Sequence, residues 1–447
     1  MSRSNSKGHG VDAVQLPRAM TCAPSSNPLR IAVVYSRLPF PMMRGDQMTV
    51  AHLLSFLAAR GHSVDLYTLA VDGSLGDEQR AWLQNSCRTV RVYEQPWRTK
   101  LLGLILGAVT LTPLQVSIFR NTKLRRELAA AVAAGEYDVV YCYYPRTAPA
   151  VPRSIRSMPR TVSFLALQLS QTLNTKRMAR NERSRLKRLV YRVETALMGR
   201  YESHVWQGFD RSVLIGPADV EAVKEQCRVH GRPEIDNWVY GAHGTDTDKF
   251  VVAQPSEVVP GRVIFSGSML YPPNVQAVLW FVENVWPTVR AARPDATFVI
   301  QGRDPAPAIL ELDGHDGLWV TGTVPDVGVL IRSAQVCVNP MLAAGGMQNK
   351  LIEYMACGKA VVASSIANEG IRAPRGALVV ADDPDAFAAA VIRLLEDPAA
   401  AADLGTAARD YVLANWTWEK HFLDLEGEFR DALSAKKIPR DVESRVG

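Results

Sequence analysis

The sequence has few cysteines and no arrangement of them that is typical of a metal site or a disulfide framework. Its six cysteines are scattered over 447 residues, with no CxxC pair and no histidine cluster at metal-ligand spacing. This pattern argues against structural zinc and favours a reducing compartment. We therefore predict that the protein needs no metal and no cofactor.

The N-terminus lacks the apolar core of a secretory signal. Residues 1–27 are instead rich in Ser, Gly and Pro, which predicts a disordered tail on a cytoplasmic protein. A second stretch, "LLGLILGAVTLTPLQVSIF" at 101–119, has no charged residue, but Pro113 and several polar residues weaken it as a spanning helix. Three interpretations stay open: a spanning helix, a buried helix and loop, and a hydrophobic flap that dips into a bilayer surface.

A large charge imbalance is also absent. The net charge of +6 and the pI near 9.0 suit an anionic partner weakly, and no nucleic-acid partner is expected. The positive charge is locally dense at 176–200, where nine Lys or Arg stand against Glu182 and Glu194, with apolar residues at helical spacing. That segment is either a solvated amphipathic helix or one that also meets anionic lipid or substrate phosphate.

The length and the order of apolar runs predict two domains. Continuous β-branched runs alternate with helical patterns, which is typical of doubly wound parallel sheets. The first series of expected strands covers 29–36, 63–69, 137–144, 160–167 and 210–216; the second covers 261–269, 296–303, 318–324, 334–340 and 359–364.

The expected boundaries follow from these two series. Residues 28–245 are expected to form an N-terminal Rossmann-like domain and 256–410 a C-terminal Rossmann-like domain, joined by the Pro-containing stretch 241–260. Single helices are expected at 274–290 and 401–433. The segment 411–447 is expected to pack its helix back on the first domain.

One stretch of the second series carries the pattern of a phosphate site. In "AGGMQNKLIEYMACG" the pair Gly345 and Gly346 precedes a helix, whose free N–H groups and positive dipole end favour a diphosphate. Lys350 and Glu353 share one face of that helix. They form either a surface ion pair or a cleft-facing pair in which the carboxylate accepts ribose hydroxyls.

Several motifs together resemble a known family. "GSMLYPPNVQAVLWFVENVWP", "FVIQGRDPAP", "VTGTVPDVGVLIRSAQVCVNP", "GGMQNKLIEYMACGKAVVAS" and "NEGI" are similar to the C-terminal lobe of the retaining family-4 (group 1) glycosyltransferases of GT-B fold. The resemblance covers about 261–410 and extends to "PFPMMRGDQ" and "ARGHSVDLYT" in the first lobe. It implies an α/β protein of two Rossmann-like doubly wound domains that face a cleft, with a C-terminal helix crossing back.

The resemblance also implies roles for individual residues. Glu353 would bind the donor ribose, the loop at Gly45 would lie near donor phosphate and acceptor, and Lys350 would face the diphosphate. The implied catalytic set is Lys350, Glu353 and Arg303; the donor-binding set is Gly45, Gly267, Ser268, Val324, Pro325, Gly345, Gly346, Gln348 and Asn349; the acceptor side is Arg44, Asp46 and Gln47.

The sequence departs from the family at three places. The first of two usual glutamates falls at Gly345, a usual arginine is Gln348, and a frequent histidine after the strand at 137–144 is absent. Tyr143, Tyr144 and Arg146 stand near that last position.

The predicted function is that of a bacterial glycosyltransferase. It would move a sugar from a nucleotide-sugar donor to a lipid-linked or polysaccharide acceptor in cell-surface glycan synthesis, with retention. The expected location is the cytoplasm, with attachment to the anionic inner face of the membrane as a further expectation. A non-catalytic GT-B partner, motivated by Gly345, and a nucleotide-sugar 2-epimerase stay open as alternatives.

Overall fold

The computed structural model describes residues 16–17, 20, 22–42, 44–71, 75–181, 184–241, 244–269, 271–342 and 347–437. The described chain forms two compact units, one of residues up to 166 with 207–211 and 429–437, the other of 167–206 and 212–428. The domain boundaries expected at 245 and 256 stay a prediction.

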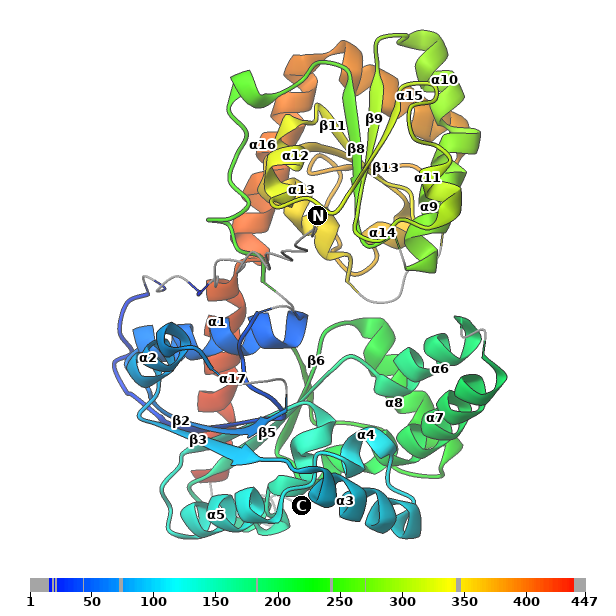
Figure 1. Ribbon diagram of the computed structural model, residues 1–447. Coiled ribbons are helices and arrows are strands. Elements are labelled where there is room, and N and C mark those ends of the chain that lie inside the picture. The colour runs from blue at the N-terminus through cyan, green and yellow to red at the C-terminus, as the bar shows by residue number, and fades with distance from the viewer. Residues whose placement is uncertain are drawn as a thin grey trace, which may run out of the picture. The chain divides into compact units, whose positions relative to one another are not determined.

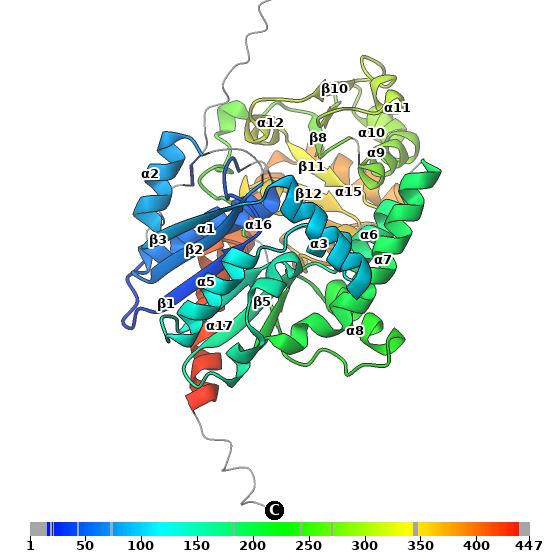
Figure 2. The same cartoon turned by 60° about the horizontal axis from the view of Figure 1, so that its bottom comes forward.

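The first sheet has seven strands in the order β3-β2-β1-β4-β5-β6-β7 (Figure 1). Figure 2 shows β1, β2 and β3 side by side, and their pairing is parallel. The strands are β1 (Arg30–Tyr35), β2 (Ser63–Ala70), β3 (Thr89–Glu94), β4 (Val139–Tyr143), β5 (Val162–Gln168), β6 (Arg211–Leu214) and β7 (Trp238–Tyr240). The sequence predicted five of them and missed β3 and β7.

Burial on both faces explains the composition of these strands. Every residue of β4 and β5 is buried, as is every residue of β1 after Arg30. Such strands read as continuous apolar runs because helices cover both faces of a parallel sheet. The helices of this part are α1 (Gly45–Ala59), α2 (Asp77–Ser86), α3 (Trp97–Thr110), α4 (Leu114–Ser117), α5 (Thr122–Ala133), α6 (Gln171–Asn181), α7 (Arg185–Val205) and α8 (Pro217–Val229), with 3-10 turns η1 (Pro145–Ala150), η2 (Arg153–Ser157) and η3 (Trp206–Gly208).

The second sheet has six strands in the order β10-β9-β8-β11-β12-β13. These are β8 (Arg262–Ser266), β9 (Thr297–Gln301), β10 (Leu318–Gly322), β11 (Val336–Asn339), β12 (Ala360–Ala363) and β13 (Val379–Val380). Helices α12, α13, α15 and α16 pack on β8, β11 and β12. The helices and the turn of this part are η4 (Pro255–Glu257), α9 (Pro272–Asn284), α10 (Trp286–Ala292), α11 (Pro307–Leu310), α12 (Val327–Ser333), α13 (Asn349–Ala356), α14 (Ser365–Asn368), α15 (Pro384–Glu396), α16 (Pro398–Asn415) and α17 (Trp418–Lys437).

Two predicted single helices are each two helices in the structure. The one expected at 274–290 divides into α9 and α10 near Pro287, whose missing N–H cannot continue the hydrogen-bond ladder. The one expected at 401–433 divides into α16 and α17 at Thr417. There the Thr245 N–H donates to the Trp416 carbonyl over 2.8 Å, and Thr245 and Thr417 form an isolated bridge. Because these backbone groups bond to Thr245, they cannot take part in the hydrogen bonds of one continuous helix.

The second half of α17 packs on the first sheet, as the predicted fold class requires. The Phe429 ring meets Phe164 of β5 and Tyr141 of β4 edge to face, with ring centroids 4.8 and 5.8 Å apart. The Lys436 ammonium lies 2.9 Å from an Asp210 carboxylate oxygen. These contacts bind the end of the described chain to β4 and β5.

Part of the expected N-terminal tail is ordered. Residues 1–15, 18–19 and 21 lie outside the described residues. Further on, the Ser25 N–H donates to the Arg60 carbonyl over 2.9 Å, and the Arg430 guanidinium donates to the Ser25 hydroxyl over 2.6 Å. The ordered contacts of this unit therefore begin before residue 28.

Replacing Phe429 by Ala should destabilise the protein by about 3–5 kcal/mol, since it removes a fully buried ring and leaves a cavity. The measurement is urea unfolding followed by circular dichroism. Leu423→Ala on the same helix, where the side chain is 38% exposed, is the control and should cost less than about 1 kcal/mol. Equal losses for both variants would contradict this account of the contact.

Candidate functional site

Both sheets reverse their strand order at one point. β1 lies next to β4 in the first sheet, and β8 lies next to β11 in the second. On one side of this point the strands follow one another outward as β1, β2, β3 or β8, β9, β10, and on the other side the later strands follow one another in the opposite direction. Ligands of doubly wound proteins bind at such a point, outside the carboxyl ends of the strands. The predicted site residues Asp46, Gly267 and Lys350 follow β1, β8 and β11, respectively.

Lys350 is the centre of the arrangement in the second sheet. Its ammonium donates to the Asn274 side-chain oxygen over 2.6 Å and lies 4.1 Å from the centroid of the Phe265 ring. Burial lowers the pKa of Lys350 to about 7, and the nearby Glu353 opposes this effect. The ammonium is therefore partly desolvated, and a bound anion would raise the pKa of Lys350 and favour its protonated form.

The backbone around Lys350 has no room for extra side-chain atoms. A Cβ atom on Gly267 would lie 2.7 Å from the Asn274 amide nitrogen and 3.1 Å from the Lys350 ammonium. The same Asn274 nitrogen donates to the Ser268 carbonyl over 2.9 Å. A Cβ atom on Gly302 would overlap the Gly267 carbonyl oxygen. A side chain at position 302 would push away the loop after β8, and one at position 267 would displace the Asn274 and Lys350 side chains.

Glu353 lies one turn after Lys350 on α13. Burial raises the pKa of its carboxyl group, and the charges of Lys249 and Lys350 act against that rise. Among the described residues its carboxylate has no hydrogen bond or ion pair, and the Lys350 ammonium donates to the Asn274 side-chain oxygen instead. The interpretation of Lys350 and Glu353 as a surface ion pair is therefore wrong, and the carboxylate is available to accept hydrogen bonds.

The other predicted donor residues lie at different distances along the sheet edge. Arg303 follows β9, and its carbonyl accepts from the Met269 N–H over 3.2 Å, so its backbone borders the loop after β8. Its side chain is exposed. Val324 and Pro325 follow β10, two strands away from β8.

The residues at the start of α13 have mixed placements. Gln348 is buried, and its carbonyl accepts from the Leu351 N–H over 2.9 Å, whereas Asn349 is exposed. The predicted phosphate-binding glycines Gly345 and Gly346 lie outside the described residues.

The predicted acceptor-side residues flank the start of α1. Gln47 is buried, and its amide donates to the Leu38 carbonyl over 3.1 Å, so it holds the loop after β1. Arg44 and Gly45 are exposed, and a Cβ atom on Gly45 would meet nothing within 4 Å. Only Asp46 joins a charged cluster.

That cluster contains two arginines that the sequence analysis did not select. Arg37 Nε lies 3.5 Å from an Asp46 carboxylate oxygen. Arg146, on η1 after β4, lies over the rings of Tyr144 and Phe119 at 4.7 and 5.3 Å, and burial and the charge of Arg37 lower its pKa. Two cations against one carboxylate leave this end of the first sheet positive.

Asn274, Lys249, Arg37 and Arg146 are the functional candidates that sequence reasoning missed. Arg37 and Arg146 follow strands next to the reversal of order, which is the signal that could have found them. Asn274 lies in the first turn of α9, and no local pattern distinguishes it. Among the described residues no group of His, Cys, Asp or Glu could hold a metal ion. The absence of a cofactor stays a prediction.

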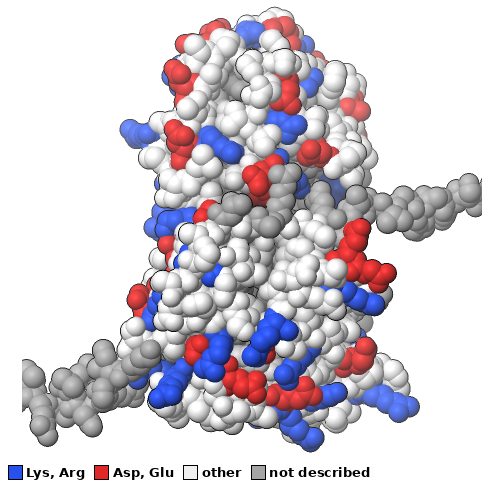
Figure 3. Space-filling model, turned by 90° about the vertical axis from the view of Figure 1, so that its left-hand side faces the viewer, with Lys and Arg blue, Asp and Glu red and all other residues white. Residues whose placement is uncertain are grey.

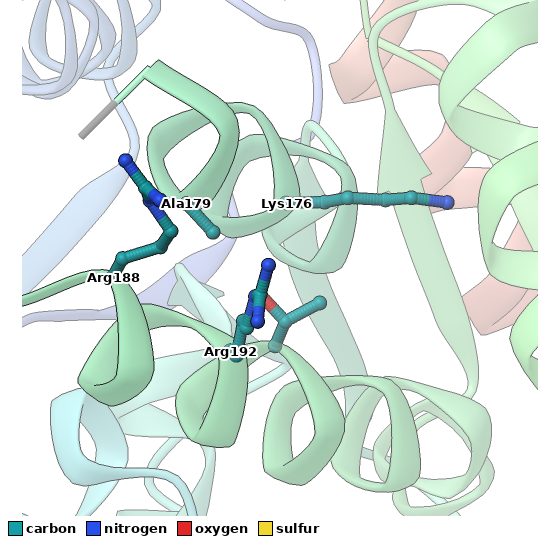
Figure 4. A pocket seen from close by; sticks show the side chains of 5 residues that line it. Lys176, Ala179, Arg188 and Arg192 are labelled. Carbon is teal, nitrogen blue, oxygen red and sulfur yellow. The ribbon is translucent and has the colours of Figure 1, made fainter. Parts of the chain in front are cut away.

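A separate cavity of about 510 Å³ lies beside α6 and α7, lined by Lys176, Ala179, Arg188, Arg192 and Thr195. In Figure 4 the Arg188 and Arg192 side chains rise from α7 toward α6, whereas Lys176 extends away from them. The predicted basic helix at 176–200 is therefore parts of two helices. Three basic side chains of these two helices, Lys176, Arg188 and Arg192, line the cavity, and their positive charge would favour a bound anion.

A buried carboxylate joins these two helices. Glu202 of α7 accepts from the Ser170 hydroxyl over 3.0 Å and from the Thr172 N–H over 3.1 Å, at the start of α6. Burial raises its pKa to about 7, and these hydrogen bonds act in the opposite direction. The carboxylate thus fixes the pair of helices through the free N–H groups of α6.

Comparison with known proteins assigns the family. Residues 260–397 match the family model described as "Glycosyl transferases group 1". A phosphatidyl-myo-inositol mannosyltransferase from Mycolicibacterium smegmatis is 30% identical over 289 residues, which is 61% of this chain and 66% of that protein. The chain belongs to the group 1 glycosyltransferases. This group 1 glycosyltransferase is therefore an enzyme of GT-B type, as the resemblance implied.

Other similarities extend over nearly the whole chain. An uncharacterized 44.6 kDa protein of the cps region of Klebsiella pneumoniae is 23% identical over 410 residues, 89% of this chain and 98% of that protein. The structure of HepE from Anabaena, in complex with UDP, covers 90% of this chain and 100% of its own with a TM-score of 0.55 and 16% identity. At 16% identity, the likeness to the HepE structure shows the fold alone.

Replacing Lys350 by Met should stabilise the protein at pH 6 by about 1–3 kcal/mol. The folded protein releases the lysine proton near pH 7, but the unfolded chain holds it to about 10.5, so burial of the charge costs most below pH 7. The loss of the Asn274 hydrogen bond reduces the gain. The measurement is urea unfolding from pH 6 to 10.

The gain should shrink as the pH rises from 7 toward 10.5 because wild-type Lys350 is then neutral in the fold. Lys123→Met, at an exposed lysine of α5, is the control and should change little at any pH. A Lys350→Met variant that is less stable than wild type at pH 6 would contradict this prediction.

Proposed function

We propose that this group 1 glycosyltransferase moves a sugar from a nucleotide-sugar donor to a lipid-linked or polysaccharide acceptor in bacterial cell-surface glycan synthesis, with retention of configuration. Transfer would take place in the cytoplasm or at the inner face of the membrane. Donor binding is assigned to the second sheet, at the loop after β8 and at α13.

The observation that carries this proposal is the polar set at the β8–β11 reversal. It combines a largely buried ammonium at Lys350, a glycine loop with no Cβ at Gly267, and a carboxylate at Glu353 without a described partner. A diphosphate next to Lys350 would leave the ribose hydroxyls about one helical turn away, within reach of the Glu353 carboxylate. The UDP in the HepE structure supports a nucleotide as ligand of this fold.

The chemistry requires stabilisation of the leaving group. The bond between the anomeric carbon and the diphosphate oxygen breaks, the electron pair leaves with the nucleoside diphosphate, and the acceptor oxygen forms the new bond to that carbon. The acceptor hydroxyl gives its proton to the departing phosphate oxygen. The Lys350 ammonium would lower the energy of the developing negative charge in a poorly hydrated site.

The acceptor class rests on related proteins and on charge. One relative is named for phosphatidyl-myo-inositol, and another is encoded in a cps region. The positive cluster of Arg37 and Arg146 and the cavity beside α6 and α7 add cations that suit a phosphate-bearing acceptor. These observations favour an acceptor with an anionic group.

Nucleotide binding is tested by a thermal-shift screen against UDP, GDP, ADP, CMP and their sugars. A ligand at 100 times its dissociation constant should stabilise the fold by about 2.7 kcal/mol. Glu353→Ala should lose most of the shift because the ribose loses its acceptor. Glu311→Ala, at an exposed glutamate, is the matched control and should keep it. A shift that survives in Glu353→Ala would place the nucleotide elsewhere.

Turnover separates the alternatives. A nucleotide-induced shift without transfer to any acceptor would favour the non-catalytic partner. A change in the donor sugar with no acceptor present would identify the 2-epimerase.

Retention is tested on the product. A donor with an α-linked sugar should yield an α-linked product, recognised in the NMR spectrum by the larger one-bond coupling between the anomeric carbon and its proton, which distinguishes the anomers of mannose as well as of glucose. A β-linked product would overturn this part of the proposal while leaving donor binding intact.

A further inference from the structure

Helix α3 exposes its large apolar side chains to solvent. Their exposed fractions range from 44% at Leu106 to 79% at Val109. The exposed set on the helix is Trp97, Leu101, Leu102, Ile105, Leu106 and Val109. The spacing places them along one broad face. A helix of a soluble protein normally turns such an apolar face toward the core, whereas α3 turns it toward solvent.

The packed side of α3 is made of glycine. Gly103 and Gly107 are its buried residues, and both face Ser117 of α4, which lies beside α3 (Figure 1). A Cβ atom on Gly103 would overlap the Ser117 carbonyl oxygen, and one on Gly107 would overlap its hydroxyl. The close approach of α3 and α4 therefore requires these glycines, and it fixes the apolar face outward.

The turn after α3 extends the same surface. Leu111 ends the helix with φ of 50°, in the left-handed region where glycine or asparagine is usual, and its side chain is 53% exposed. Leu114 adds a further exposed side chain at 39%. More than half of the Leu111 surface is therefore exposed, in a backbone conformation that leucine rarely adopts.

The charged residues of the segment that carries this surface have one sign. No Asp or Glu occurs between Glu94 and Glu127, whereas six Lys or Arg flank the apolar residues within that span: Arg98, Lys100, Arg120, Lys123, Arg125 and Arg126. The Arg98 guanidinium lies 5.7 Å from the centroid of the Trp97 ring. On the face in Figure 3, by contrast, acidic and basic side chains are interspersed. Apolar side chains on a segment whose charged residues are all basic complement an anionic lipid surface.

We propose that α3 and the turn after it dock the protein on an anionic bilayer, with the helix lying in the plane of the interface. Fourteen residues span about 21 Å, less than the roughly 30 Å of a hydrocarbon core, and no described helix is long and apolar enough to cross a membrane. The open interpretation of a buried helix at 101–119 is wrong, and the flap interpretation becomes this proposal. Docking at α3 also names the surface at which the enzyme would meet a lipid-linked acceptor. Only this statement about the acceptor rests on the proposed function.

The test is cosedimentation of the full chain with vesicles. Wild type should bind vesicles of 70% phosphatidylcholine and 30% phosphatidylglycerol at least tenfold more tightly than pure phosphatidylcholine, and raised salt should weaken the binding. Leu102→Glu with Leu106→Glu should reduce binding at least tenfold. Leu310→Glu is the matched control, since Leu310 and Leu102 are 54% and 55% exposed, and it should bind as wild type does.

Circular dichroism and an unchanged Tm must show that the double variant is folded. Trp97→Phe should also remove part of the fluorescence that brominated acyl chains quench, which reports insertion rather than contact with headgroups. Wild-type binding by the folded double variant would overturn the proposal. So would a dimer in lipid-free sedimentation velocity that the double variant loses, because the face would then be an interface between two copies.

The outcome is independent of donor binding. The double variant should keep the nucleotide-induced thermal shift of wild type, whereas Glu353→Ala should bind vesicles normally. Vesicle binding without any nucleotide shift would leave the docking surface established and remove the proposed donor site. A nucleotide shift without vesicle binding would do the reverse.

Discussion

The reversal of strand order in each parallel sheet is the constraint on which the arrangement of candidate residues depends. Strands on either side of the reversal send their following loops in opposite directions, so the carboxyl ends there are left uncovered. Side chains from loops that are distant in sequence meet at these points. Gly267 and Lys350 come together in the second sheet, and in the first the charge of Asp46 acts on Arg146.

The site in the second sheet is a poor arrangement for stability alone. Lys350 loses water around its charge and gains in return a hydrogen bond to the Asn274 side-chain oxygen and a weak one to the Met341 sulfur, and two glycines permit the close approach of the loops. Each of these features costs free energy that an apolar side chain would not. Such a cost is typical of positions held for binding. The same reasoning applies to α3, whose exposed leucines are of no use to the isolated chain.

Local pattern predicted what depends on near neighbours. Long buried runs such as β1 and β5 were found because burial on both faces makes them continuous. Strand β3 was missed because it is only partly buried and polar residues interrupt its apolar pattern, whereas β7 and β13, of three and two residues, are too short to show a pattern. The break at Thr417 was missed because its partner, Thr245, is far away in sequence. The partner of Lys350 was missed for the same reason, since 76 residues separate it from Asn274.

The sequence by itself determined the two doubly wound series, the family, and the placing of Lys350 and Glu353 on one helical face, because these follow from periodicity and from motifs of adjacent residues. The tertiary structure decided that Lys350 bonds to Asn274 and leaves the Glu353 carboxylate open. It also decided that α3 turns its leucines outward. A periodic apolar face indicates that a helix has two sides, but only the contact of Gly103 and Gly107 with Ser117 shows which side is packed.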